Sequence, residues 1–246
     1  MRLLIDLGNT RLKWAQQTTG DWRTDVAALA GRDVVPLLDK VWRAIPAPEK
    51  IVISSVSSPE TLQVVTHWIE RNWSIPPHVI RAQAEQLGVK NGYTDPATLG
   101  ADRWAALIAV RGLTALPACI VDCGTAVTVD ALSADGEFLG GVIFPGLHLL
   151  RNSLTHGTQG IKKVADGNDA ECLARSTADG VAAGTLFGLV GAMEHLIQEY
   201  RKTLGEGMQI FLTGGDAPRL APRLKLSVTR MPDLVLKGLA RVADSL

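Results

Sequence analysis

The chain contains one short motif twice: an apolar strand that ends in aspartate, a glycine two residues later, and small polar residues after it. The two copies occupy residues 3–10 (LLIDLGNT) and 120–126 (IVDCGTA). Their aspartates, Asp6 and Asp122, are 116 residues apart, close to half of the 246-residue chain, which predicts a duplicated lobe. The glycine lets backbone N–H groups approach an anion, and the aspartate can supply an oxygen to a hydrated metal ion. The pair of loops therefore predicts a phosphate-binding site, although one such loop alone fits a hairpin turn equally well.

Composition limits the class of protein. Hydrophobic residues make up 46% of the chain, which is enough for real cores, and 25 basic residues balance 25 acidic ones. With no net field, neither nucleic acid nor a membrane is expected as a partner. The three cysteines are odd in number and form no Cys-x-x-Cys pair, which argues against disulfides and a zinc site. This cysteine usage fits the reducing cytoplasm as the expected location. No uninterrupted apolar run approaches the roughly 20 residues of a membrane span.

Local patterns predict a first lobe over residues 1–115 and a second over residues 116–246. In the first lobe we expect a hairpin of strands 2–7 and 11–16, a less regular stretch, a strand over 50–56, a helix that opens at Ser58, and a helix over 99–112 that ends at Gly112. In the second lobe we expect strands over 118–123, 126–132 and 137–144, a long helix over about 176–204, a strand over 208–212 and a closing helix over 234–242.

Two further segments could carry chemistry. The turn Thr213–Asp216 follows a buried-looking strand, and its glycines would let a flat base or ribose lie against the backbone. The segment from Tyr93 to Trp104 delivers Asp102 and Arg103 together at a helix start. Asp102 could simply favour the positive helix N-terminus, with Arg103 in a surface ion pair. Alternatively, Asp102 accepts a proton from a substrate hydroxyl, and Arg103 fixes an anionic or polar group of that substrate.

Four motifs together resemble those of one known family, the type III pantothenate kinases. They are Asp6–Thr10 with Lys13, Leu99–Arg103, Asp122–Ala126 with Thr128 and Asp130, and Gly140–Gly146, in that order along the chain. The family is part of the superfamily of acetate and sugar kinases, heat-shock chaperone ATPases and actin. The resemblance implies an α/β fold of duplicated ribonuclease H-like (actin-like ATPase) lobes, with mixed sheets flanked by helices and the nucleotide in the cleft between the lobes.

The resemblance also implies roles for particular residues. The first phosphate loop, which binds ATP, would consist of Asp6, Leu7, Gly8, Asn9, Thr10, Arg11, Leu12 and Lys13, and the second would include Gly124 and Thr125. Asp122 would bind a monovalent cation, potassium or ammonium, and magnesium would accompany ATP. The pantothenate pocket would be lined by Tyr93, Gly100, Ala101, Asp102, Arg103 and Thr177, with Asp102 as the proton acceptor. Thr213–Asp216 would face the adenosine, and the family is dimeric, with the long helix of the second half near the subunit interface.

The implied activity is ATP-dependent phosphorylation of pantothenate to 4′-phosphopantothenate, the first step of coenzyme A biosynthesis. One alternative is a transcriptional accessory or regulatory protein on the same scaffold. Another is a kinase of a different small hydroxyl substrate, such as a sugar or acetate. The intact set of Asp6, Asp102, Arg103, Asp122 and Thr125 argues against a protein that has abandoned catalysis, and the 99–103 segment favours pantothenate as the acceptor.

Overall fold

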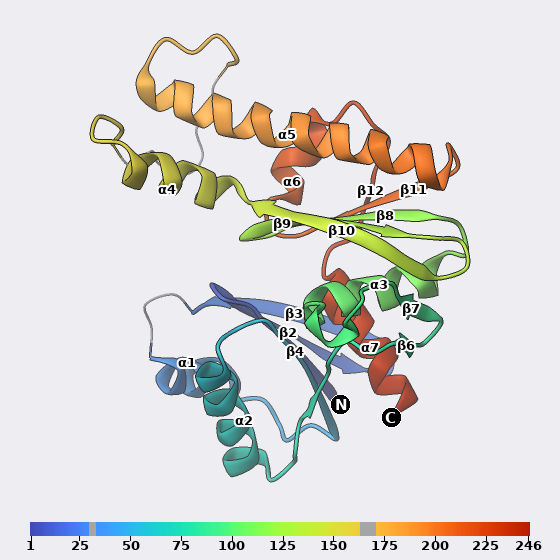
Figure 1. Ribbon diagram of the computed structural model, residues 1–246. Helices are drawn as coiled ribbons and strands as arrows, with labels where there is room; N and C mark the ends of the chain where they lie inside the picture. The colour runs from blue at the N-terminus through green and yellow to red at the C-terminus, as the bar shows by residue number, and fades with distance from the viewer. Residues whose placement is uncertain (30–32, 163–170) are drawn as a thin grey trace. The chain divides into compact units, whose positions relative to one another are not determined.

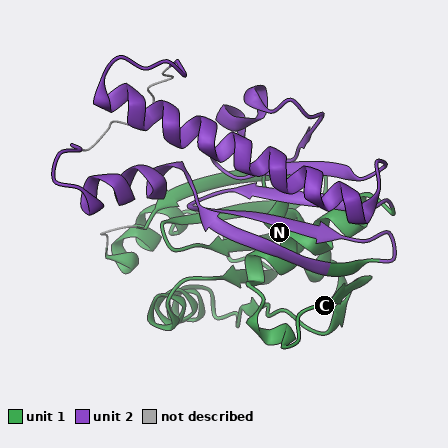
Figure 2. Ribbon diagram, turned by 45° about the horizontal axis from the view of Figure 1, so that its top comes forward, with its two compact units in different colours: residues 1–115, 136–138, 233–246 green, residues 116–135, 139–232 purple. Residues whose placement is uncertain are grey.

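The computed structural model describes residues 1–29, 33–162 and 171–246 (Figure 1). Two compact units make up the chain (Figure 2). Unit 1 contains residues 1–115, 136–138 and 233–246, and unit 2 contains residues 116–135 and 139–232. The units are therefore not two consecutive stretches of chain. The C-terminal helix α7 (Leu234–Ser245) is part of unit 1 because it packs on α3 (Ala101–Leu113), and it approaches so closely that a Cβ on Gly238 would collide with the backbone of Ala105.

Unit 1 is built on a five-stranded mixed sheet in the order β3-β2-β1-β4-β5. Its strands are β1 (Arg2–Leu7), β2 (Arg11–Thr18), β3 (Asp21–Ala28), β4 (Lys50–Ser55) and β5 (His78–Val79). The β1–β2 and β2–β3 pairs are antiparallel, whereas β4 runs parallel to β1 and β5 parallel to β4. The predicted hairpin and the strand that begins at Lys50 are confirmed.

The two faces of this sheet have different partners. Leu3, Ile5 and Leu7 point to one face, where they share a core with α1 (Val34–Trp42) and α2 (Pro59–Trp73). Ser58 caps α2 as predicted, since its hydroxyl accepts the N–H of Thr61. Because side chains alternate along a strand, Asp6 points to the opposite face. That face of β1 and β4 is covered by α7, and α3 also contacts β4.

The segment that leads into α3 contains three short elements. They are β6 (Glu85–Gln86), β7 (Val89–Asn91) and a 3-10 turn, η1 (Pro96–Thr98). The strand β7 pairs in parallel with the start of β10 (Glu137–Pro145). The paired residues of β10, Glu137 and Phe138, belong to unit 1. The prediction that Gly112 ends α3 is wrong. The helix continues to Leu113, with Thr114 as its C-cap. Glycine at position 112 leaves room for the Arg241 guanidinium, which a Cβ there would meet.

Unit 2 contains a sheet in the order β12-β11-β8-β9-β10. Its strands are β8 (Ala118–Cys123), β9 (Ala126–Leu132), β10 (Glu137–Pro145), β11 (Gln209–Thr213) and β12 (Thr229–Arg230). Antiparallel β8 and β9 form the second hairpin, and β11 runs parallel to β8. The sheet is thus mixed, as in unit 1. The predicted strands over 118–123 and 126–132 are confirmed.

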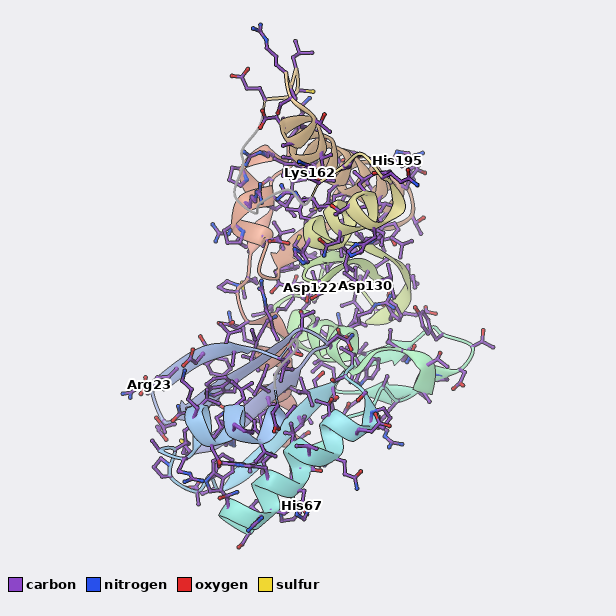
Figure 3. The ribbon with its side chains drawn as sticks, turned by 90° about the vertical axis from the view of Figure 1, so that its left-hand side faces the viewer. Arg23, His67, Asp122, Asp130, Lys162 and His195 are labelled. Atoms are coloured by element: carbon purple, nitrogen blue, oxygen red, sulfur yellow. The ribbon has the colours of Figure 1, made fainter. Side chains whose placement is uncertain are left out.

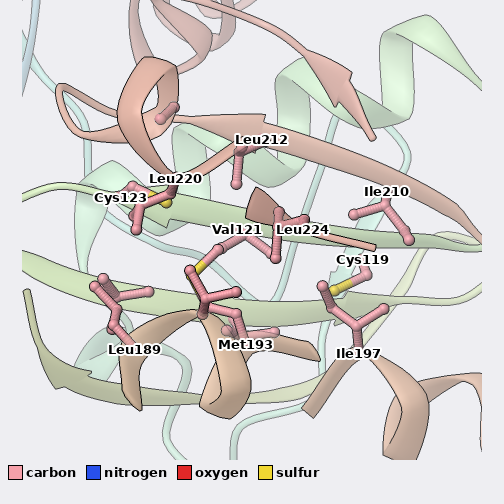
Figure 4. Packing of buried hydrophobic residues seen from close by; sticks show 14 of the residues in the cluster. Cys119, Val121, Cys123, Leu189, Met193, Ile197, Ile210, Leu212, Leu220 and Leu224 are labelled. Atoms are coloured by element: carbon pink, nitrogen blue, oxygen red, sulfur yellow. The ribbon is translucent and has the colours of Figure 1, made fainter. Parts of the chain in front are cut away.

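Helix α5 (Thr177–Leu204) covers one face of this sheet; α4 (Leu147–Gly157), α6 (Ala217–Leu220) and the turn η2 (Ala221–Arg223) complete the unit. Leu189, Met193 and Ile197 of α5 pack against side chains of β8 and β11 (Figure 4). By length and composition alone α5 could cross a membrane, a feature that a search for uninterrupted apolar runs misses. Half of the most apolar stretch of α5 is buried inside the protein, as in the core helix of a globular domain.

Candidate active site

The first Asp-x-Gly loop joins β1 to β2 in unit 1. The N–H of Gly8 bonds to the Arg11 carbonyl at 3.0 Å, which closes the tight turn. Asp6 is buried and pairs in register with Lys13 on β2. The Lys13 ammonium lies 3.5 Å from the Asp6 carboxylate. The hairpin therefore places one acid and one base of the predicted phosphate loop side by side.

The charge of Asp6 depends on its burial and on two neighbouring residues. Burial raises the pKa of Asp6 to about 6, Lys13 opposes this rise, and the Asp102 carboxylate adds to it. Burial also raises the pKa of Asp102, while the N–H and guanidinium of Arg103 and the more distant Lys13 lower it. Unit 1 thus brings together Asp6, Lys13 and Asp102, which are separated by up to 96 residues in the sequence.

Asp102 lies in the first turn of α3. Gly100 caps this helix without a side chain, and the Asp102 carboxylate accepts the N–H of Arg103 at 2.7 Å. A Cβ on Gly100 would lie 2.7 Å from that carboxylate oxygen, so glycine leaves the space that Asp102 occupies. The positive end of the helix favours the ionised carboxylate. Asp102 is half-buried, which leaves part of it accessible to a reactant.

Arg103 is buried beside Tyr93, and the two form one contact group. The guanidinium donates to the Tyr93 hydroxyl at 2.9 Å and lies 5.7 Å from the centre of the Tyr93 ring. It also lies 5.5 Å from the centre of the Phe138 ring, within the range of a cation–π interaction. The structure therefore brings together two residues that the sequence predicts for the acceptor pocket and adds Phe138, which it did not predict.

Asn91 is a second residue that the sequence reasoning missed. Its side-chain oxygen accepts the N–H of Tyr93 at 3.0 Å, and its side-chain nitrogen donates to the Pro96 carbonyl at 3.2 Å. An asparagine that bonds to the backbone two residues on is a known turn signal, so Asn91 could have been found locally. Phe138 has no such signal, because it comes from the start of β10, 45 residues after Tyr93.

The second Asp-x-Gly loop joins β8 to β9 in unit 2. Asp122, which Figure 3 labels, is the next-to-last residue of β8 and is half-buried. The N–H of Gly124 bonds to the Ala126 carbonyl at 3.1 Å, and the N–H of Gly146 bonds to the Thr125 carbonyl at 3.0 Å. This turn is one residue shorter than that of the first copy, with three residues between the paired Cys123 and Val127 against four between Leu7 and Leu12, and Gly146 fixes it from a second side.

The predicted third turn, Thr213–Asp216, lies directly against this loop. Gly214 has a φ of +94°, and a Cβ there would collide with the Cys123 backbone and lie 2.5 Å from a carboxylate oxygen of Asp122. The N–H of Asp216 also bonds to the Cys123 carbonyl at 3.0 Å. Unit 2 thus brings the second loop and the third turn together.

One predicted residue of the acceptor pocket lies apart from these contacts. Thr177 is exposed at the start of α5, where the Ser176 hydroxyl caps the helix by accepting the N–H of Asp179 at 3.1 Å. Among residues 1–29, 33–162 and 171–246, no group of three or more His, Cys, Asp and Glu side chains is arranged to hold a metal ion.

Solved structures define the class of fold. The chain matches a Sinorhizobium meliloti protein, provisionally assigned as a 2-dehydro-3-deoxygalactonokinase, with a TM-score of 0.62 and 15% identity over 100% of this chain and 99% of the other. An archaeal actin homologue matches with a TM-score of 0.51 and 10% identity over 100% and 99% of the two chains. At these identities the likeness shows the fold, which is that of the actin-like ATPases and sugar kinases, as the sequence predicts.

Sequence comparison identifies the family within this class. The family model of the type III pantothenate kinases matches residues 2–199. The type III pantothenate kinase of Halorhodospira halophila is 41% identical over 245 residues, which cover 97% of this chain and 96% of the relative. The chain belongs to the type III pantothenate kinase family and is a phosphotransferase.

Proposed function

We propose how this chain carries out the type III pantothenate kinase reaction, the ATP-dependent phosphorylation of pantothenate to 4′-phosphopantothenate that begins coenzyme A biosynthesis. The observation that carries the proposal is the geometry of two predicted elements in unit 1. The Lys13 ammonium lies 3.5 Å from the Asp6 carboxylate, and at the start of α3 the Asp102 carboxylate is fixed by the N–H of Arg103, whose guanidinium bonds to Tyr93. The family match favours this activity over a purely regulatory role.

Asp102 is the proposed catalytic residue. It accepts the proton of the primary hydroxyl of pantothenate while that oxygen bonds to the γ-phosphorus and the bond from phosphorus to the ADP oxygen breaks. Phosphoryl transfer has a loose transition state, so the position of Asp102 matters more than its strength as a base. Gly100 and the Arg103 N–H, which fix the carboxylate at the start of α3, support this role.

The two loops are the proposed phosphate-binding elements. Residues 6–13 of unit 1, with the Lys13 ammonium, and Gly124 and Thr125 of unit 2 bind the phosphates of ATP, and the Thr213–Asp216 turn binds its adenosine. The glycines let the backbone of each loop approach an anion without a Cβ in the way. A backbone hydrogen bond closes each loop into a tight turn. Magnesium, bound with ATP near Asp6, would neutralise charge on the transferred phosphoryl group.

The acceptor site is proposed at Tyr93, the Gly100–Arg103 segment and Thr177. Arg103 supplies a buried guanidinium whose position is fixed by a hydrogen bond and two aromatic rings. A fixed guanidinium suits the carboxylate of pantothenate, because charge-assisted hydrogen bonds to a carboxylate are strong and directional. Ala101 is the buried first residue of α3 within this segment.

Asp122 is the proposed ligand of a monovalent cation, potassium or ammonium. The glycines around it fit such an ion, since a side chain at Gly214 would lie 2.5 Å, and one at Gly124 3.4 Å, from an Asp122 carboxylate oxygen. The hard oxygen donor suits a cation of modest charge, which would neutralise phosphate charge without imposing the octahedron of magnesium.

We further propose that the chain acts as a cytoplasmic homodimer without a nucleic-acid or membrane partner. The balanced charge of the chain supports the second part. The support for the dimer is the outer face of α5, where Cβ atoms at Gly180, Gly184, Gly188 and Gly191 would meet nothing within 4 Å. Such a face allows a second helix to approach closely.

The catalytic role is tested by the release of ADP from ATP, magnesium and pantothenate. Asp102→Asn should keep the fold and lower kcat by about 100-fold or more, since it removes the proton acceptor but not the shape. Asp25→Asn is the matched control, because Asp25 also accepts the N–H of the next residue at 2.7 Å but is exposed on β3. Near-normal turnover by folded Asp102→Asn would remove Asp102 from this role.

The cation site is tested in the same assay with potassium or ammonium replaced by sodium. The wild type should be faster in potassium or ammonium, and Asp122→Asn should lose this preference because a neutral amide binds a cation weakly. Asp135→Asn, in the exposed β9–β10 turn of the same unit, should retain it. Equal wild-type rates in all three salts would contradict the assignment.

A further inference from the structure

One side chain, that of Asn91, connects the start of the turn before α3 to its middle. Asn91, the last residue of β7, is half-buried and uses both ends of its amide. One end accepts the Tyr93 N–H and the other donates to the Pro96 carbonyl, at 3.0 and 3.2 Å. Pro96 begins the 3-10 turn that leads to Gly100. Asn91 therefore fixes Tyr93 relative to the segment that delivers Asp102 and Arg103.

The neighbouring strand supports the same turn from below. Asn91 pairs in register with Phe138, and the Phe138 carbonyl accepts the N–H of Gly92 at 3.0 Å. The Phe138 ring is fully buried, with its centre 5.3 Å from that of Tyr93. Arg103 then bonds to the Tyr93 hydroxyl and packs on both rings. A contiguous set of contacts runs from the Asn91 amide through Tyr93 to the Arg103 guanidinium.

We propose that Asn91 is a positioning residue for the acceptor substrate: it orients Tyr93, and through the Tyr93 hydroxyl it holds the Arg103 guanidinium ready for the carboxylate of pantothenate. This inference rests on the proposed placement of pantothenate at Tyr93 and Arg103. Asn91 acts through these two residues and not on the reacting atoms. A group fixed in advance loses less freedom when the substrate binds, so the effect belongs to substrate affinity and not to the chemical step.

The test is steady-state kinetics of Asn91→Ala with pantothenate and ATP varied separately. The KM for pantothenate should rise about tenfold, while kcat and the KM for ATP stay within about twofold. Asn72→Ala is the matched control, since the Asn72 amide also donates to a backbone carbonyl, that of Trp68 at 2.8 Å, but lies on α2. It should leave all three constants unchanged.

A second variant separates the two hydrogen bonds. In Asn91→Ser the hydroxyl can still accept the N–H two residues on, as serine does in turns, but is too short to hold Pro96. The KM for pantothenate should then rise only about threefold. A rise as large as that of Asn91→Ala would overturn the proposed route through Tyr93. This smaller change also serves as the test if Asn91→Ala does not fold.

Tyr93→Phe distinguishes failure of this inference from failure of the proposed site. It removes only the hydroxyl that Arg103 contacts and should raise the KM for pantothenate. If Tyr93→Phe raises it and Asn91→Ala does not, the acceptor site stands and the role of Asn91 is overturned. If neither raises it, the placement of pantothenate is wrong, and the inference falls with it. A parallel rise in both KM values for Asn91→Ala would show a general structural effect and would also overturn the inference.

Discussion

Asp6 is a buried carboxyl group whose pKa is raised from 3.8 to about 6, mainly by loss of hydration. The folded protein therefore binds a proton more tightly at Asp6 than the unfolded chain does. The resulting stabilisation is complete below pH 3.8 and is lost as the pH rises through 6. The full shift corresponds to about 3 kcal/mol.

Replacement of Asp6 should remove this pH dependence. Between pH 4 and 7, the free energy of unfolding of Asp6→Asn, measured with urea in the absence of nucleotide, should gain on that of the wild type by up to about 3 kcal/mol. Loss of the Lys13 partner shifts the variant's whole curve but does not change this pH dependence, because the pKa of about 6 already includes the effect of Lys13. The exposed control Asp25→Asn should follow the wild type. Parallel curves for Asp6→Asn and the wild type would show that Asp6 titrates normally.

Single residues differ in how far the sequence could predict them. Tyr93 and Arg103 were predicted from a motif, and the structure adds that they bond to each other. Asn91 and Phe138 were missed for different physical reasons. The two bonds of Asn91 follow from the path of a turn, whereas Phe138 reaches Arg103 only because β10 pairs with β7. Pairing between distant strands is not encoded in any short stretch of sequence.

At the scale of elements, the Thr213–Asp216 turn at the end of β11 packs closely against the end of β8. Gly214→Ala combines an unfavourable positive φ with a collision against Cys123 and Asp122. Gly20→Ala is the matched control, because Gly20 has a φ of +84° but open space around it. In thermal or urea unfolding, Gly214→Ala should cost about 1–3 kcal/mol more than Gly20→Ala and should lower activity. Equal costs would mean that the turn moves freely away from β8.

The elements that sequence patterns predicted are those with strong local signals. The hairpin β1–β2 has a glycine in its turn, and the helices α2 and α5 have serine caps, Ser58 and Ser176. The strand β3 was not predicted, since most of its side chains are exposed and it shows no alternating pattern. It forms as an edge strand because β2 provides hydrogen-bond partners along its whole length. The helix α1 was also missed, within the same irregular-looking stretch.

At the scale of the whole molecule, the sequence predicted two lobes and placed the closing helix in the second, residues 116–246, whereas α7 belongs to unit 1. Helix α7 is apolar along the side that packs on α3, β1 and β4, and it returns the chain to unit 1. The ion pair between Arg2 and Asp244 joins the two ends of the chain within that unit. The pattern of hydrophobic residues shows that one side of a helix will be buried, but it does not identify the element against which that side packs.

The proposed dimer is the prediction that concerns the molecule as a whole. Phe187 is 40% exposed on α5, the helix that also carries the open glycine positions. Burial of an aromatic ring against a second copy would stabilise a dimer, and a charge in its place would destabilise it. In sedimentation, the wild type should have about twice the chain mass of 26.3 kDa, and Phe187→Glu should shift towards the monomer. Val35→Glu alters an apolar residue on α1 that is 44% exposed, so it should leave the mass unchanged. A wild-type monomer would contradict the dimer, and a Phe187→Glu dimer as stable as the wild type would place the interface away from Phe187.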